Sequence, residues 1–248
     1  MQKLSILVAV GAALGLAPEA AGALTPQEIF AKVSPAVWVV RAHHAQNGST
    51  ALGSAVVIAP RLLVTACHVV VGATAVEVAR DAGKSVVPIQ TVSRDPDRTR
   101  DLCLLNASSD VSGAPVAIAP IGEVKVGEPA YAIGAPLGLE LTLTDGLVSA
   151  LRHNNNEPMP DIQTSAAIAP GSSGGGLFDS QGRLIGVTVA IASKETDNLA
   201  FAYPAEWVVQ LPARITAARQ RWSAALTAHG LALGLDGEPP ASCLVRSE

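Results

Sequence analysis

A serine set among glycines, Ser173 within Gly171–Gly176, is the residue of this sequence best suited to nucleophilic chemistry. A serine hydroxyl is a weak nucleophile at neutral pH, so it needs a base beside it. The oxyanion that its attack creates needs N–H donors. Glycine would let the N–H groups of Gly171 and Ser173, with Ser172 between them, point into one pocket. By itself, a run of this kind is more often a flexible loop, so the assignment depends on partners elsewhere.

Two residues could supply the base and the group that orients it. His68 ends an apolar run, and an imidazole can take and return a proton near neutral pH. Asp101 opens the apolar run 102–105, where its carboxylate would accept the imidazole N–H and fix the tautomer. A lone histidine is more often a hydrogen-bonded core residue, and Asp95 and Asp97 are nearby competitors. We prefer Asp101 because the strand that begins beside it would anchor its position.

The order His68, Asp101, Ser173 is the order found in chymotrypsin. It would spread a catalytic triad over two β units and place the site in a cleft between them. A rival interpretation is an esterase elbow, because Gly171–Gly175 also fits G-x-S-x-G and Asp197 and His229 follow in the right order. That interpretation needs a helix directly after the serine. The residues after Ser173 are glycine-rich and then strand-like, which disfavours it.

The elements that would position these residues are mostly short β-branched runs separated by Gly, Pro or polar clusters. They predict an all-β barrel or sandwich, preceded by a short helix over 26–33. Two helices are expected after residue 204, over 205–211 and 213–229. The predicted strands are 37–40, 53–58, 62–65, 75–79, 86–92, 102–105, 130–133, 141–151, 162–165, 184–192 and 199–203.

Composition and the first residues indicate an exported protein. Of the 248 residues, 49% are hydrophobic and 15% charged, and the net charge is −4 with scattered basic residues, which argues against nucleic acid as a partner. Lys3, the apolar run 4–16 and Ala21–Ala23 predict a signal peptide over 1–23. The run is shorter than the roughly 20 residues that span a bilayer, although an uncleaved anchor stays an alternative. We expect no stable membrane insertion after cleavage and a periplasmic or secreted location.

Several motifs, in order, resemble the trypsin-like serine peptidases of the HtrA/Deg group. They are Leu52–Ile58, Thr65–Val70, Asp101–Leu105, Ala132–Leu139, Gly146–Ala150 and Ile162–Pro170 running into the serine loop. The resemblance implies a chymotrypsin-like double β-barrel, hydrolysis of polypeptide substrates and no cofactor or metal. It makes His68 the base, Asp101 its orienting group and Ser173 the nucleophile. The oxyanion hole would comprise Gly171, Ser172 and Ser173.

On this reading the chain divides into a signal peptide (1–23), an N-terminal barrel (24–111), a C-terminal barrel (112–204) and C-terminal helices with a tail (205–248). We expect no peptide-binding PDZ domain of the kind often attached to HtrA proteases. The sequence does not indicate an oligomeric state.

The chain also departs from the family pattern. Ser172 and Gly176 stand where the family commonly has Asn and Pro, and the extra glycine predicts a more flexible serine loop. Ala167 stands six positions before the nucleophile, where a protease that cleaves after Lys or Arg has an acidic residue. This predicts a preference for small or aliphatic side chains. The backbone of Ala190, Ile191 and Ala192 would pair with the substrate as an added strand.

Cys67 and Cys103 lie beside the expected base and its orienting group, which predicts a disulfide between them in an oxidising compartment. Two buried thiols are the alternative. With three cysteines in all, Cys243 would be the unpaired one. A rival of another class also stays open: a catalytically silent protease fold that binds exported peptides or partners, since Ser172 and Gly176 could leave the serine loop misassembled.

Overall fold

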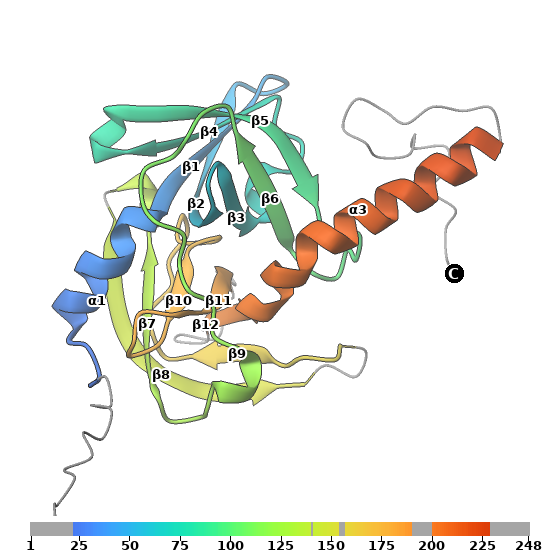
Figure 1. Cartoon of the computed structure of the whole chain (residues 1–248). Helices are drawn as coiled ribbons and strands as arrows, with labels where there is room; N and C mark the ends of the chain where they lie inside the picture. The colour runs from blue at the N-terminus through green and yellow to red at the C-terminus, as the bar shows by residue number, and fades with distance from the viewer. Residues whose placement is uncertain (1–21, 140, 154–156, 190–199, 229–248) are drawn as a thin grey trace, which may run out of the picture.

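The twelve strands of the structure, a computed structural model that describes residues 22–139, 141–153, 157–189 and 200–228, form two closed barrels (Figure 1). All strand pairs within the barrels are antiparallel. The expected all-β double barrel with a C-terminal helical segment is therefore confirmed. Helix α1 (Pro26–Val33) lies along one side of the molecule, and helix α3 (Ala205–Ala228) leaves from the junction of the barrels.

Helix α1 begins where the sequence predicts, because Thr25 and Glu28 cap it reciprocally. The Glu28 N–H donates to Thr25 Oγ1 (3.3 Å), and the Thr25 N–H donates to the Glu28 carboxylate (2.8 Å). Pro26 fits the first turn, where no intrahelical N–H bond is needed. The helix buries Ile29 and Val33 against the core shared by the two barrels.

The first barrel closes in the strand order β1-β2-β3-β6-β5-β4. Its unbroken apolar run in β6 is explained by burial on both faces. Cys103 and Leu105 join the core inside this barrel, whereas Leu102 and Leu104 join the core between the barrels. The elements are η1 (Ser34–Ala36), β1 (Val37–His44), β2 (Ser49–Ala59), β3 (Leu62–Ala66), α2 (Cys67–Val70), β4 (Ala75–Arg80), η2 (Asp81–Gly83), β5 (Ser85–Arg94) and β6 (Leu102–Ala107).

The second barrel closes in the order β10-β11-β12-β9-β8-β7. Strand β10 was not predicted, because it has only three residues and starts inside the glycine run. The predicted strand over 184–192 is described only as far as Val189. The elements are η3 (Ile121–Glu123), β7 (Pro129–Gly134), η4 (Pro136–Gly138), β8 (Thr142–Arg152), β9 (Asp161–Thr164), β10 (Gly176–Phe178), β11 (Leu184–Val189) and β12 (Ala200–Pro204).

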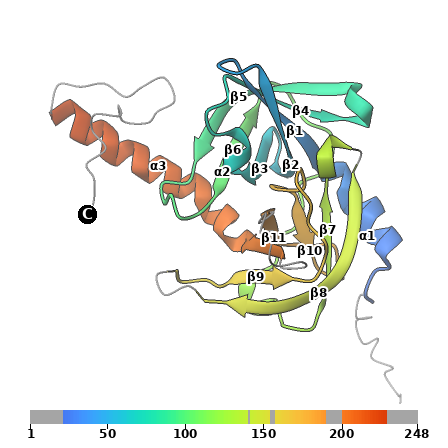
Figure 2. The same ribbon diagram turned by 180° about the vertical axis from the view of Figure 1, so that it is seen from behind.

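A continuous apolar core joins the two barrels. Val56, Val64 and Leu104 of the first barrel pack in one cluster with Ile133 and Phe178 of the second. Helices α1 and α3 contribute to the same cluster, and in the view from behind (Figure 2) α3 again leaves from this junction. Because this apolar surface is buried only when the barrels associate, the core fixes the two halves relative to one another.

The prediction of two C-terminal helices is wrong in one respect, because α3 is continuous through Pro212. A proline inside a helix offers no N–H to the carbonyl four residues earlier, here that of Val208, which led us to expect a break. Burial outweighs this loss: Trp207, Val208 and Leu211 are packed into the core between the barrels. Tertiary contacts therefore hold the first half of α3 in place.

Candidate active site

His68 and Asp101 meet because strands β3 and β6 are paired. The ladder runs to Ala66 opposite Leu102, so the residues just beyond it also face one another. The Cys67 N–H donates to the Asp101 carbonyl (3.0 Å), and the His68 N–H donates to Asp101 Oδ1 (2.8 Å). Asp101 Oδ2 contacts His68 Nδ1. When the carboxylate accepts the Nδ1 proton, Nε2 is left as an acceptor, as a general base requires.

The two competing carboxylates have other partners. Asp95 is buried and contacts Arg214 of α3, while Asp97 accepts hydrogen bonds from the backbone and hydroxyl of Thr99. Asp101 is the carboxylate that contacts His68. The His68 side chain is 47% exposed and the Asp101 side chain 22%, so a substrate could reach the imidazole while the carboxylate stays partly shielded.

The serine loop approaches the same place from the second barrel. The Ser54 N–H in β2 donates to the Ser173 carbonyl (2.8 Å). Gly53, next to it, leaves no room for a side chain: an added Cβ would lie 2.5 Å from Val69 Cγ1 and 3.2 Å from the Ser173 carbonyl. Gly53 thus marks where the turn that carries His68 and the loop that carries Ser173 both touch β2. The structure brings the three expected triad segments together at the barrel junction.

The backbone around Gly171 has a defined orientation. The Pro170 carbonyl accepts the Leu137 N–H (2.8 Å). This carbonyl and the Gly171 N–H belong to one trans peptide, so the Gly171 N–H points away from Leu137. The Ser172 N–H is already used, because it donates to the Ala169 carbonyl (2.9 Å). Of the three amides expected in the oxyanion hole, that of Ser172 is therefore turned to an internal partner.

Gly176 is closely packed in the structure. Gly176 begins β10, and an added Cβ would lie 2.4 Å from two ring carbons of Phe178 and 2.9 Å from Leu184 Cδ1. The ring of Phe178 occupies the space that a side chain at 176 would need. The Ser172 carbonyl is also held, by the N–H of Gly175 (3.0 Å) and the hydroxyl of Thr188 (2.7 Å). The departures from the family pattern are accommodated by packing.

The residues expected to contact substrate are only partly described. Ala167 is exposed, and its carbonyl accepts the Thr144 hydroxyl (2.8 Å). Ala190, Ile191 and Ala192 lie outside the described residues, as do Asp197 and His229 of the esterase interpretation. A strand, β10, follows the serine loop where the esterase elbow requires a helix, and this rules out that architecture.

The structure joins Cys67 and Cys103 through their sulfur atoms, with a Cα–Cα distance of 4.9 Å. Both residues are fully buried in the core of the first barrel. Cys103 lies opposite Thr65 in the β3–β6 ladder, and Thr65 is three residues before His68 in the sequence. The bridge would thus connect the segment that carries His68 to the one that carries Asp101. Cys243 lies outside the described residues.

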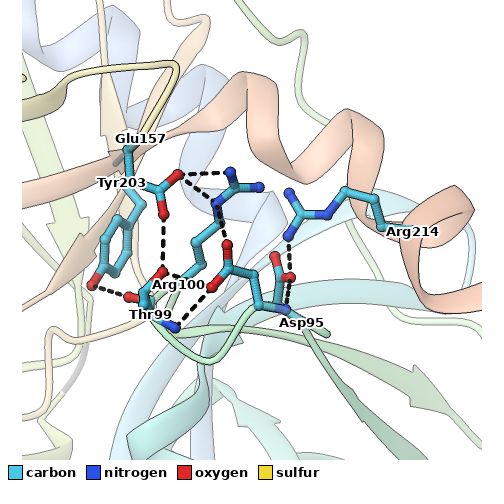
Figure 3. Close-up of polar contacts among 7 residues, drawn as sticks. Asp95, Thr99, Arg100, Glu157, Tyr203 and Arg214 are labelled. Carbon is cyan, nitrogen blue, oxygen red and sulfur yellow. Dashed lines mark hydrogen bonds and ion pairs between the residues drawn. The ribbon is translucent and has the colours of Figure 1, made fainter. Parts of the chain in front are cut away.

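A polar network behind Asp101 was missed by the sequence reasoning (Figure 3). Arg100 packs its guanidinium carbon 4.4 Å from the ring centroid of Trp207, and its Nη2 lies 2.6 Å from Glu157 Oε2. The Thr99 hydroxyl lies 2.9 Å from Glu157 Oε1. Arg100 lies directly before Asp101, which was a signal. Its partners, far along the chain, carry no local sequence signature.

The electrostatics of this network are governed by burial. Desolvation raises the pKa of Asp95 to about 6, against the opposing effects of the Asp97 N–H and the Arg100 charge. Desolvation also raises the pKa of Tyr203, assisted by the Asp161 and Asp101 carboxylates.

Across the described ranges, no cluster of three or more His, Cys, Asp or Glu side chains could hold a metal ion. Within the same ranges, no helix has the length and hydrophobicity to cross a membrane.

The fold and the site define a class, and comparison with known proteins names it. The family model of the trypsin-like peptidase domain matches residues 53–187, and the chain belongs to this family. Within this family, the proteins that the chain resembles include proteases of the HtrA type. The "Periplasmic serine endoprotease DegP" of Escherichia coli (strain K12) is 36% identical over 177 residues, which are 68% of this chain and 37% of that protein. The "Serine protease PepD" of Mycobacterium tuberculosis is 38% identical over 120 residues, 45% of this chain and 25% of that protein.

Solved structures agree with this placement. The structure described as "HtrA-type protease AlgW with tripeptide" has a TM-score of 0.64 and 30% sequence identity, covering 75% of this chain and 62% of that one. The chain therefore spans only part of the length of the relatives that it matches.

Proposed function

We propose that this protein is a serine endopeptidase that hydrolyses peptide bonds through His68, Asp101 and Ser173. The observation that carries the proposal is the contact of Asp101 with both the backbone and the imidazole of His68, beside the loop that bears Ser173. A histidine held in this way by a carboxylate is oriented to act as a general base. The names of the relatives, which are serine proteases, support the same function.

In the proposed mechanism, His68 takes the proton of the Ser173 hydroxyl as the oxygen attacks the substrate carbonyl. Asp101 stabilises the imidazolium that forms. The N–H groups of Gly171 and Ser173 would bind the oxyanion, since the Ser172 N–H has an internal partner. His68 then donates its proton to the leaving amine. Water then attacks the acyl-enzyme: His68 takes a proton from the water as its oxygen bonds to the acyl carbon, and gives the proton to the Ser173 oxygen as the ester bond breaks.

The finer proposals concern substrate, location and the disulfide. The small Ala167 would admit small or aliphatic side chains before the scissile bond.

The relative DegP is named periplasmic. Together with the segment 1–23, this name supports export of the protein to the periplasm or beyond. In that compartment Cys67 and Cys103 would stay bridged. Alkylation under denaturing conditions is expected to modify one cysteine before reduction and three after it; three before reduction would exclude the bridge.

Labelling with a fluorophosphonate, which phosphonylates activated serines, tests the proposal. We expect stoichiometric labelling that mass spectrometry locates at Ser173 and that Ser173→Ala abolishes. Cleavage of a peptide library should then show whether peptides are substrates and which side chains precede the cut. A folded wild-type protein that neither labels nor cleaves would contradict the proposal and favour a catalytically silent peptide-binding protein.

A further inference from the structure

Ser54 lies in strand β2, and its side chain connects three segments at the barrel junction. Its hydroxyl donates to the Gly171 carbonyl (2.9 Å) and accepts the Ala135 N–H (2.9 Å). Its own N–H donates to the Ser173 carbonyl (2.8 Å). Ser54 itself is fully buried; its bond with the Ala135 N–H is buried as well, and its bond with the Gly171 carbonyl is partly buried. One residue of the first barrel thus holds both the serine loop and the segment that leads from β7 into η4.

The bond to the Gly171 carbonyl matters because the peptides on both sides of Gly171 are held by hydrogen bonds. The peptide before Gly171 is held by the bond from the Leu137 N–H to the Pro170 carbonyl (2.8 Å). The peptide after Gly171 is held through its carbonyl by Ser54 Oγ. Gly171 has a φ of +94°, a conformation open to glycine but to few other residues, so its own torsions restrain the loop weakly. The Leu137 contact therefore sets the direction of the Gly171 N–H, and the Ser54 contact holds the next peptide, which joins Gly171 to Ser172.

We propose that Ser54 is a positioning residue for the oxyanion site, acting through the Gly171 carbonyl; this inference rests on the proposed peptidase function. Without the hydroxyl, the buried Ala135 N–H and the partly buried Gly171 carbonyl both lose a partner. Rotation of the peptide between Gly171 and Ser172 would let that carbonyl seek another donor. Without this anchor Gly171 itself could move, because its φ of +94° restrains it weakly, and its N–H would shift from its place at the oxyanion. Substrate binding, which does not need this N–H, would be largely retained.

The test compares Ser54→Ala with Val78→Ala in the full chain. Val78 is fully buried in the core of the first barrel, in β4, and controls for general loss of packing. The readouts are the limiting rate and half-saturating concentration for fluorophosphonate labelling, and the hydrogen exchange of amides in peptides that cover 169–176. For Ser54→Ala we expect the limiting rate to fall at least about tenfold, approaching the loss seen when an oxyanion donor is removed.

The half-saturating concentration should change less than about twofold, because only the transition state uses the oxyanion donors. Exchange in 169–176 should become faster in Ser54→Ala. Val78→Ala should lower the melting temperature while leaving both readouts as in the wild type. If Ser54→Ala does not fold, Ser54→Cys, which keeps a weak donor of similar size, should show a smaller loss in both readouts.

Two results would overturn the inference: wild-type labelling rates in the folded Ser54 variant, or unchanged exchange across 169–176. A wild-type protein that does not label contradicts the proposed function instead. The exchange comparison does not depend on activity, so it still decides whether Ser54 positions the loop in that case.

Discussion

The two barrels are joined beside the triad by two polar contacts of different chemistry. On the serine side, Ser54, which is fully buried, makes two bonds of 2.9 Å through one neutral hydroxyl. On the aspartate side, Arg100 contacts Glu157 and Trp207, and Arg214 contacts Asp95, in a network that is partly open to water. We call the first the Ser54 contact and the second the Arg100 network.

The difference indicates what each contact can do. A buried hydroxyl that bridges a carbonyl and an N–H fixes a peptide plane and responds little to salt or pH. Charged groups can hold segments together over a longer reach, but their desolvation is expensive and their strength depends on protonation and ionic strength. We therefore expect the Ser54 contact to govern the reaction rate, and the Arg100 network to govern stability and its dependence on conditions.

The largest expected effect on stability comes from Arg214→Met. This change leaves the carboxylate of Asp95, whose side chain is fully buried, without the cation that it contacts. Breaking a buried ion pair from one side typically lowers the free energy of unfolding by about 3 to 5 kcal/mol. Urea denaturation at pH 7.5 measures the loss in free energy of unfolding, and fluorophosphonate labelling of the folded variant is measured in parallel. A labelling rate reduced as much as in Ser54→Ala would break the proposed division between the two contacts.

The next effect is a pH dependence that Asp95 introduces. Its pKa is about 6 in the folded protein and 3.8 as the reference for an unfolded chain, so the folded state binds the proton more tightly. Stability from this group is full below pH 3.8 and is lost as the pH rises through about 6. This shift in the pKa of Asp95 corresponds to roughly 3 kcal/mol in the free energy of unfolding.

The measurement is the free energy of unfolding of the wild type and of Asp95→Asn at pH 4.5 and pH 7.5. Taking the difference between the two proteins removes the contribution of other acids. The wild type should gain stability relative to Asp95→Asn on acidification. A difference that is independent of pH, or that has the opposite sign, would show that Asp95 is not the group responsible.

The smallest effect is expected for Glu157→Gln, which removes one charge of the Arg100 network but keeps an oxygen that can accept a hydrogen bond. Because the Glu157 and Arg100 side chains are each 12% exposed, we expect a loss of about 2 kcal/mol in unfolding free energy that shrinks as salt is added. Glu123→Gln is the matched control, since its bond to Arg183 is equally short (2.6 Å) but Glu123 is 55% exposed. Equal losses in the two variants would contradict the importance of burial here.

Much of the fold could be predicted from local patterns. The alternation and β-branching of the strands, and the Thr25–Glu28 cap of α1, are local signals, and the structure agrees with them. Strand β10 was missed because three residues that start with Gly176 carry no periodicity. The continuity of α3 through Pro212 was missed because it depends on the burial of Trp207 and Leu211 rather than on helix propensity.

The candidate site shows the same limit. His68, Asp101 and Ser173 could be proposed from residue type, order and family resemblance, because the chemistry restricts which residues can serve. The roles of Ser54 and Glu157 could not, since their bonds reach residues distant in the sequence. Nor could the sequence show that Gly176 packs against the ring of Phe178, which leaves no room for a side chain at this position.

The sequence by itself determined most of the strands, the family and the residues capable of the chemistry, because these follow from side-chain type and local spacing. Only the tertiary structure decided which peptide planes of the serine loop are held, and which charges are buried behind Asp101. The physical reason is that hydrogen-bond direction and desolvation depend on neighbours brought together by packing across the barrel junction, and no short stretch of sequence encodes them.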